Sequence, residues 1–265
     1  DAHLRTADLR AAMERLLRRR RRLEPVRAQL QGKVTDEMRE TARTLLGLPK
    51  RQLFCTSAPV DLSFVLTMPG EFDLTGLTCP EVTPAKNVAL QKGEYFAYLA
   101  RHDLLLALPY QSVNPFVDLL YEAADDPDVV SIKITLYRLA GSSRIAAALA
   151  YAAEHGKQVQ CLLELRARFD EQSNIDYSRM LEDAGCGSLY GLTKYKVHTK
   201  LCLITRRCPG GICYYTQVGT GNYNEKTAEQ YTDLMLLTSD PAIGRDAART
   251  FDRLARGETV GETES

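Results

Sequence analysis

The clearest chemistry in this sequence is a histidine and a lysine separated by one residue. His198 and Lys200 lie in an apolar, strand-like run that we expect to span 196–204. Because alternate residues of a strand share a face, the imidazole and the ammonium group would point the same way. A cation is costly to bury without a purpose, and one purpose is to stabilise a phosphorylated imidazole. The alternative is that His198 is a structural strand residue that takes part in no reaction.

A glycine-rich turn follows this pair at a distance of one hairpin. The sequence GTGN occupies 219–222, and its glycines permit backbone amides to converge on an anion. The side-chain amide of Asn222 can orient a phosphate oxygen or the imidazole. The turn alone is a weak signal. Its position after His198 and Lys200 favours a phosphate site, with Gly219 and Asn222 as binding residues.

Two arginines follow two predicted strands. Arg138 comes directly after the strand expected over 129–137, and Arg168 comes shortly after the strand expected over 159–165. If these strands are parallel, their carboxyl ends meet at one edge of the sheet, where open α/β folds bind ligands. Guanidinium groups bind phosphate oxygens in a bidentate manner. We interpret the pair as a phosphate clamp; the alternative is two surface arginines at strand ends.

These residues need a framework of alternating strands and helices, and the sequence from about Gly93 supplies it. β-Branched residues mark the strands, and Ser142 or Ser143 is expected to cap a helix that Gly156 ends. Gly185 closes the next helix. We expect helices at 114–124, 144–155, 175–184 and 242–255, and further strands at 214–218 and 232–238. This order predicts an α/β domain with a mixed sheet flanked by helices.

The first part of the chain carries no chemistry that the sequence identifies. An amphipathic helix opens it and ends in a run of arginines, 18–22, before Pro25 breaks the helix. We interpret these arginines as a solvated helix end and not as a nucleic-acid patch, because no aromatic residues alternate with them to stack on bases. A second helix is expected over 35–48 with Thr35 as its N-cap. The stretch 49–92 is predicted to be irregular.

Composition limits the other function classes. The chain has 265 residues with 34 Lys and Arg against 34 Asp and Glu, so we expect no nucleic-acid partner. No apolar run reaches the ~20 residues that span a bilayer, so we expect no transmembrane segment. The seven cysteines show no disulfide framework or metal-binding pair, and Pro-Gly-Gly between Cys208 and Cys213 predicts a hairpin turn. These features favour reduced cysteines and a cytoplasmic location, with association at a membrane left open.

Several motifs together resemble the polyphosphate kinase family of the phospholipase D-like superfamily. The histidine, the lysine and the glycine turn resemble one half-site of that superfamily, and the surrounding sequence narrows the resemblance. The matching motifs are IKITLYR at 132–138, ELRARFDE at 164–171, VHTK at 197–200, GTGNYNEKTA at 219–228 and YTD at 231–233. Weaker similarity extends to VDLSF at 60–64, DLLL at 103–106 and PY at 109–110.

The resemblance implies a fold and an activity. The fold would be a phospholipase D-like layered α/β domain, preceded by a smaller, partial α+β domain. His198 would accept the terminal phosphoryl group of ATP as a phosphohistidine and pass it reversibly to inorganic polyphosphate. Neighbouring cations should lower the pKa of His198 and keep the imidazole neutral, as attack requires. ATP, ADP and polyphosphate are the partners implied, and the full-length protein is expected to be a homo-oligomer.

The resemblance also implies roles for the other site residues. Arg138 and Arg168 match positions that hold phosphate and its Mg²⁺, the cofactor implied by the family. A guanidinium group cannot donate a lone pair to a metal, so we interpret both arginines as phosphate clamps near the ion. Lys200 and Asn222 match the phosphate-site pair of the superfamily. Tyr231 matches a nucleotide-contacting position.

The implied domains are a partial head domain at 1–88 and the first catalytic domain at 89–265. The family pattern also contains a second catalytic domain with its own histidine, and we expect that none of His3, His102 and His155 replaces it. The chain is therefore expected to be a fragment that carries a half-site. Two alternatives stay open: a non-catalytic module that binds polyanions, and a phosphodiesterase of the phospholipase D-like kind.

Overall fold

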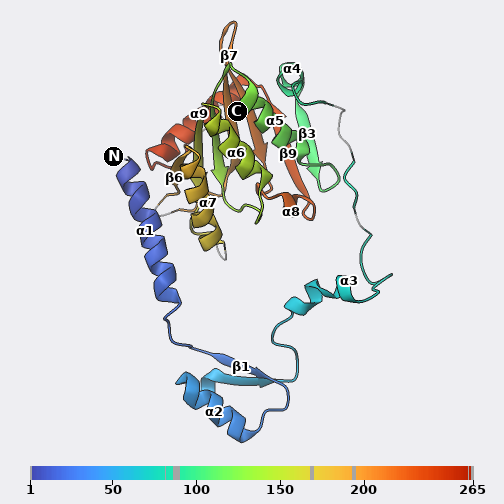
Figure 1. The fold of residues 1–265 in the computed structure, drawn as a ribbon, viewed down its shortest axis with the longest axis vertical. Coiled ribbons are helices and arrows are strands. Elements are labelled where there is room, and N and C mark those ends of the chain that lie inside the picture. Colours follow the sequence, from blue (N-terminus) through green and yellow to red (C-terminus); the bar gives the residue numbers. More distant parts are fainter. Residues whose placement is uncertain are drawn as a thin grey trace. The chain divides into compact units, whose positions relative to one another are not determined.

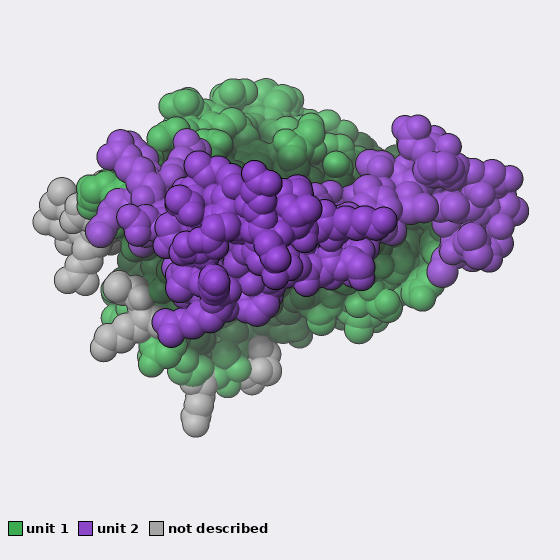
Figure 2. Space-filling model, turned by 90° about the horizontal axis from the view of Figure 1, so that it is seen from below, with its two compact units in different colours: residues 1–15, 82–265 green, residues 16–81 purple. Residues whose placement is uncertain are grey.

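The computed structural model describes residues 2–80, 82–85, 90–167, 170–192, 195–261 and 263. The chain divides into two compact units, one formed by residues 16–81 and the other by residues 1–15 and 82–265 (Figure 2). The first helix, α1 (Ala2–Arg20), contributes residues to both units. The domain boundary predicted between 88 and 89 stays a prediction, because 86–89 lie outside the described residues.

The smaller unit is built on two parallel strands joined through a helix. Its elements are β1 (Ala28–Gln31), α2 (Asp36–Leu46), η1 (Lys50–Gln52), β2 (Leu53–Thr56), η2 (Ser63–Leu66) and α3 (Met68–Glu71). The hydroxyl of Thr35 accepts a hydrogen bond from the Met38 amide at 3.2 Å and caps α2, as the sequence predicts. The prediction of an irregular stretch over 49–92 is wrong at β2, which pairs in parallel with β1. The sequence does not reveal this strand, because a strand of four residues depends on its partner for stability.

The larger unit contains, within the described residues, a seven-stranded sheet in the order β3-β9-β8-β7-β4-β5-β6. Its strands are β3 (Leu104–Leu108), β4 (Val129–Leu136), β5 (Gln158–Leu163), β6 (Gly187–Tyr190), β7 (Lys200–Cys208), β8 (Gly211–Gly219) and β9 (Asp233–Thr238). β4, β5 and β6 pair in parallel, and the other pairings are antiparallel. The predicted α/β class with a mixed sheet is confirmed.

Helices cover both faces of this sheet (Figure 1). They are α4 (Tyr95–Leu99), α5 (Asn114–Asp125), α6 (Arg144–Glu154), α7 (Glu171–Asp183), α8 (Glu225–Ala228) and α9 (Pro241–Ala255). α5, α6 and α7 lie on one face, and α9 lies on the other, where its Ala247 and Phe251 pack against Leu201 and Leu203 of β7. Burial on both faces explains the nearly continuous apolar runs of the central strands. No helix in the described part of the chain is both long and apolar enough to cross a bilayer.

Local signals set the ends of the helices as the sequence predicts. Ser143 caps α6, because its hydroxyl accepts a hydrogen bond from the Ala146 amide at 3.2 Å. Gly156 and Gly185 follow α6 and α7 with φ angles of 80° and 92°, the left-handed conformation that favours glycine. The capped start of α6 limits the length of the loop after β4, and that loop carries Arg138.

Strand register brings the predicted site residues to one edge of the sheet. β4 and β5 are parallel, with Leu136 opposite Leu163, so their carboxyl ends meet as predicted. β7 runs antiparallel to β4, which places its first residue, Lys200, at the same edge. In the β7–β8 hairpin, Lys200 lies opposite Gly219. This edge therefore carries the candidate site.

The strand that follows the histidine starts later than the sequence indicates. A strand was expected over 196–204, but β7 begins at Lys200, so His198 precedes it. Side chains bind the backbone around the histidine in place of a neighbouring strand, and the Val197 amide, for example, donates to Glu164 at 2.9 Å. Strand alternation therefore does not place the imidazole beside the ammonium group.

The hairpin between β7 and β8 corrects the prediction for two cysteines. The turn at Pro-Gly-Gly is confirmed, with Cys208 opposite Gly211. A disulfide joins Cys208 to Cys213, whose Cα atoms are 6.0 Å apart, so the expectation of reduced cysteines is wrong for this pair. The hairpin register explains the pairing, because Cys213 lies opposite Arg206 and hence diagonally across from Cys208.

Candidate functional site

His198 and Lys200 form the centre of the candidate site. The Lys200 Nζ atom lies 3.0 Å from Nδ1 of His198 and donates a hydrogen bond to the His198 carbonyl oxygen at 2.6 Å. Lys200 is buried, with 5% of its surface exposed, whereas His198 is exposed. The two groups that the sequence predicts to act together are therefore in contact.

Residues around the end of β4 complete the surroundings of His198. The Tyr137 ring meets the His198 ring edge to face, with centroids 4.7 Å apart and an interplanar angle of 85°. Lys200 Nζ lies 5.5 Å from the centroid of the same tyrosine ring. Arg138 follows Tyr137, and its Nε forms an ion pair with Asp170 at 2.8 Å. Arg138 thus adds positive charge that acts on the imidazole and is held by a carboxylate.

Partial burial and nearby positive charge lower the pKa of His198 below its ordinary value of 6.5. Loss of water around the ring is the largest cause, and the charges of Lys200, Arg138 and Lys196 follow. The pKa of Lys200 is lowered as well, because its ammonium group is buried, and Asp233 opposes that shift. A lowered pKa keeps the imidazole neutral at physiological pH, which nucleophilic attack requires. The direction agrees with the expectation from the sequence.

The glycine turn lies against Asp233 at the start of β9. Thr220 donates a hydrogen bond from its hydroxyl to Asp233 Oδ1 at 2.6 Å, and its amide donates to the Leu234 carbonyl at 3.0 Å. A β-carbon on Gly221 would lie 2.6 Å from Asp233 Oδ2, and one on Gly219 would lie 3.1 Å from the Leu234 carbonyl oxygen. Both glycines therefore allow the turn to approach β9 more closely than a residue with a side chain would. The predicted anion binding by backbone amides does not extend to Thr220, whose amide is engaged.

Asn222 and Tyr231, predicted to bind phosphate and nucleotide, lie on either side of α8. The side-chain Oδ1 of Asn222 is buried and has no hydrogen-bond partner among the described residues. Tyr231 is 62% exposed. Within the turn, the buried Tyr223 stacks on Phe116 of α5, with ring centroids 5.3 Å apart. The core thus supports the turn, while the roles of Asn222 and Tyr231 stay predictions.

The described residues around the predicted magnesium position do not form a set of metal ligands. Arg168 lies outside the described residues, and Arg138 is ion-paired with Asp170 and has no lone pair to donate to a metal ion. Among the residues that the structure describes, no three His, Cys, Asp or Glu side chains come together in a way that could hold a metal ion. The described residues therefore offer no set of protein ligands for Mg²⁺, and we derive no chemical step through the ion.

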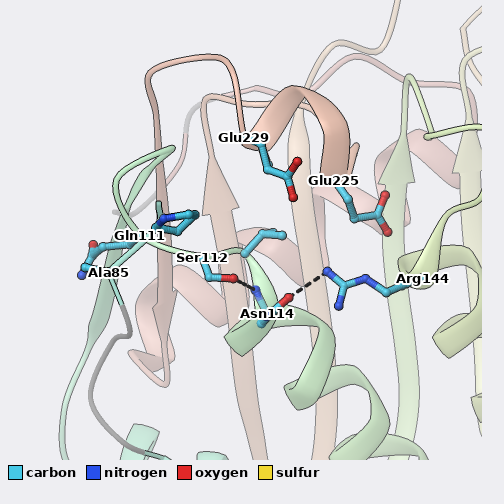
Figure 3. A pocket seen from close by; sticks show the side chains of 10 residues that line it. Ala85, Gln111, Ser112, Asn114, Arg144, Glu225 and Glu229 are labelled. Atoms are coloured by element: carbon cyan, nitrogen blue, oxygen red, sulfur yellow. Dashed lines mark hydrogen bonds between the residues drawn. The ribbon is translucent and has the colours of Figure 1, made fainter. Parts of the chain in front are cut away.

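A pocket of about 570 Å³ lies beside α8, at the starts of α5 and α6 (Figure 3). Arg144 and Asn114 meet at its wall, with Nη2 of the arginine donating to Oδ1 of the asparagine at 2.7 Å. Glu225 of α8 also lines it, and its Oε1 accepts hydrogen bonds from the Ile145 amide at 3.0 Å and the Ser143 hydroxyl at 3.2 Å. This carboxylate attaches α8 to the start of α6 and so holds the chain that follows the glycine turn.

A second His-x-Lys sequence, His155-Gly156-Lys157, lies at the end of α6. The Nδ1 atom of His155 lies 2.8 Å from the Tyr151 carbonyl oxygen, and the two rings are 3.9 Å apart. Lys157 donates a hydrogen bond to the Asp126 carbonyl oxygen. Spacing alone would admit this pair as a second site, but each of the two side chains contacts a backbone carbonyl oxygen, His155 that of Tyr151 and Lys157 that of Asp126. The expectation that His155 does not act as a second catalytic histidine stays a prediction.

Sequence reasoning missed the residues that hold the histidine in place. Glu164, Arg166 and Thr135 bind the backbone around His198, and Tyr137 contacts its ring. All four lie in motifs that the sequence analysis identified, although without a role. The signal in the sequence was the position of Glu164, a carboxylate that directly follows an apolar strand. In the structure only 2% of its surface is exposed.

The fold and the site together define a layered α/β domain with a histidine-centred, positively charged site at one edge of a mixed sheet. The sequence profile of the family described as "Polyphosphate kinase C-terminal domain 1" matches residues 94–259. The chain belongs to the polyphosphate kinase family, and the family predicted from the sequence is confirmed.

Individual relatives agree with this assignment. The polyphosphate kinase of Staphylococcus haemolyticus is 38% identical over 252 residues, which cover 94% of this chain and 35% of that protein. The polyphosphate kinase of Streptomyces coelicolor is 41% identical over 256 residues, covering 92% and 34%. The crystal structure of polyphosphate kinase from Porphyromonas gingivalis superposes with a TM-score of 0.61 at 32% identity, covering 78% of this chain and 34% of that chain. The chain thus spans about a third of the length of the curated relatives it matches.

Proposed function

We propose that this chain is a phosphoryl-transfer domain of a polyphosphate kinase, in which His198 takes the terminal phosphoryl group of ATP and passes it to inorganic polyphosphate. The observation that carries the proposal is the contact between the exposed His198 ring and the buried Lys200 amine, 3.0 Å apart, opposite a glycine turn. Phosphoryl transfer depends on positioning and on neutralising the charge of the moving group. Lys200 and Arg138 supply positive charge next to the imidazole, where the negative charge of the moving phosphoryl group must be neutralised.

The first step is attack of the imidazole on the terminal phosphorus of ATP. Attack through Nε2 requires the ring proton on Nδ1, and the Lys200 amine 3.0 Å away can exchange a proton with that nitrogen. The Nε2–P bond forms while the bond from phosphorus to the bridging oxygen breaks, and ADP leaves with the electron pair. Nδ1 keeps its proton through this step, and the phosphorylated ring carries it into the next one.

In the second step, a terminal oxygen of polyphosphate attacks the same phosphorus. The Nε2–P bond breaks, its electron pair returns to Nε2, and Nδ1 still carries its proton. The same two steps run backwards from polyphosphate to ATP. Arg138 would bind non-bridging oxygens of the moving group, since its guanidinium group matches their geometry. From the family resemblance, the proposal also includes a homo-oligomeric full-length protein and a cytoplasmic location.

Formation of a phosphohistidine tests the proposal. The chain incubated with magnesium and ATP labelled in the terminal phosphate should acquire an acid-labile, alkali-stable label that mass spectrometry maps to His198. His198→Gln should abolish the label, and the matched variant His155→Gln should leave it unchanged. Absence of label from the unmodified chain, or persistence of label in His198→Gln, would overturn the proposal.

A further inference from the structure

The loop that carries His198 has no strand to hold it. Residues 195–199 belong to no helix or strand, so their backbone polar groups need partners elsewhere. Val197 anchors the loop in an apolar cluster with Leu162 and Leu189. Apolar packing fixes how deeply Val197 is buried, but it is not directional and does not fix the orientation of the loop. The orientation is set by polar contacts from the end of β5.

Glu164, the first residue after β5, binds this loop from the protein interior. Its Oε2 accepts a hydrogen bond from the Val197 amide at 2.9 Å. Its Oε1 accepts from the Arg166 amide at 3.0 Å and from Arg166 Nε at 3.3 Å. A β-carbon on Gly191 would lie 2.7 Å from Oε2, so the chain passes directly over the carboxylate. The amide that Glu164 holds belongs to the immediate neighbour of His198.

Arg166 extends the same contact toward the start of the loop. Its Nη2 donates hydrogen bonds to the Leu192 carbonyl oxygen at 2.6 Å and to the Tyr195 carbonyl oxygen. The guanidinium group also pairs with the charge of Glu164, which would be costly to bury alone. We propose that Glu164 and Arg166 form a clip that positions His198. They are positioning residues that act through the backbone, and the catalytic meaning of the clip rests on the proposed function of His198.

The clip matters because few contacts locate the His198 ring. Lys200 Nζ lies 3.0 Å from its Nδ1, and the Tyr137 centroid lies 4.7 Å from its own centroid. On the side away from the clip, the Thr135 hydroxyl donates to the Thr199 carbonyl oxygen at 2.7 Å. Without the clip, only the packing of Val197 holds the chain before the histidine. A displacement of about 1 Å at a reacting group can lower a rate by about 10²-fold.

A matched pair of substitutions separates positioning from general stability. Glu164→Gln removes the charge and keeps the shape, but its NH₂ group replaces one of the two oxygens, so either Val197 or Arg166 loses its acceptor. The control is Glu122→Gln. Glu122 is equally a buried carboxylate, 7% exposed, and its two oxygens accept three backbone amide hydrogen bonds of 2.9 to 3.0 Å at the start of α4. Both substitutions should lower the free energy of unfolding measured in urea to a similar extent.

Two measurements on the nucleotide-free chain report the position of His198. They are the rate of carbethoxylation by diethyl pyrocarbonate, resolved by peptide mass, and the NMR titration of the ring. Glu164→Gln should raise that rate several-fold and move the pKa of His198 toward its ordinary value, whereas Glu122→Gln should change neither. Arg166→Met should reproduce both changes and serves as the second variant if Glu164→Gln does not fold. Arg166→Lys should restore part of the difference.

The outcomes separate this inference from the proposed function. Unchanged His198 reactivity in Glu164→Gln and Arg166→Met, or an equal change in Glu122→Gln, would overturn the clip. Neither readout uses ATP, so a failure to form phosphohistidine refutes the proposed function and leaves the clip standing. Where phosphohistidine does form, the clip variants should lower kcat by about tenfold or more and leave KM for ATP unchanged, because they displace the nucleophile and do not touch the nucleotide.

Discussion

Replacing Lys200 with methionine should raise the pKa of His198 toward its ordinary value. Lys200 Nζ lies 3.0 Å from the ring nitrogen, where two unit charges repel each other by about 1.4 kcal/mol at a water-like dielectric constant. This energy is a lower limit, because burial of Lys200 and of part of the His198 ring strengthens the interaction. Burial of part of the ring and the charge of Arg138 persist in the variant, so the pKa should stay below 6.5.

An NMR titration of the histidine ring protons measures this shift. The chain has four histidines, and the resonance that disappears in His198→Gln assigns the site. Lys196→Met is the control, and it should shift the pKa of His198 less, because Lys196 is the weakest of the three cationic influences on the ring. Salt should reduce the difference between Lys200→Met and the unmodified chain, since exposed charges are screened. An unchanged or lower pKa of His198 in Lys200→Met would refute the reasoning that the lysine charge acts on the imidazole.

Three further predictions concern the same edge of the sheet. Because the pKa of His198 is lowered from 6.5 in the folded chain, the unfolded chain binds its proton more readily and stability falls as the pH drops below about 6.5; His198→Gln should lose less stability than the unmodified chain between about pH 7.5 and about pH 5.5, measured by urea unfolding. Gly221→Ala places a β-carbon 2.6 Å from Asp233 Oδ2 and should slow phosphohistidine formation, whereas Gly141→Ala, with no heavy atom within 4 Å, should not; equal rates in the two variants would contradict this. Phe116→Ala removes a fully buried ring beneath the glycine turn and should lower the free energy of unfolding by about 3–5 kcal/mol in urea titration, and a loss no larger than that of a surface substitution would show that the ring does not support the turn.

Much of the fold followed from local signals in the sequence. The β-branched run of β4, the serine cap of α6 and the glycines at positions 156 and 185 are each set by neighbours in the chain, and each was predicted. β3 was not predicted as a strand, because its strand character depends on β9, more than 100 residues away. β2 and β6 are four residues long and likewise exist through distant partners.

The site divides in the same way. His198, Lys200 and the glycine turn are close in sequence, and the hairpin that joins them is local, so their proximity could be predicted. The contact of Glu164 with Val197 crosses 33 positions and depends on how the loop after β6 returns to the end of β5. No periodicity encodes that return. The role of Arg168 stays a prediction for another reason, since it lies outside the described residues.

The disulfide-closed hairpin offers a practical way to hold the molecule without disturbing its reactive end. β7 has nine residues, so at about 3.3 Å per residue its tip lies about 26 Å from Lys200. The tip projects beyond the neighbouring helices, and Ile212 there is 54% exposed (Figure 1). An affinity tag or fluorophore inserted between Pro209 and Gly210 would therefore orient the domain on a sensor surface with the histidine facing free solution.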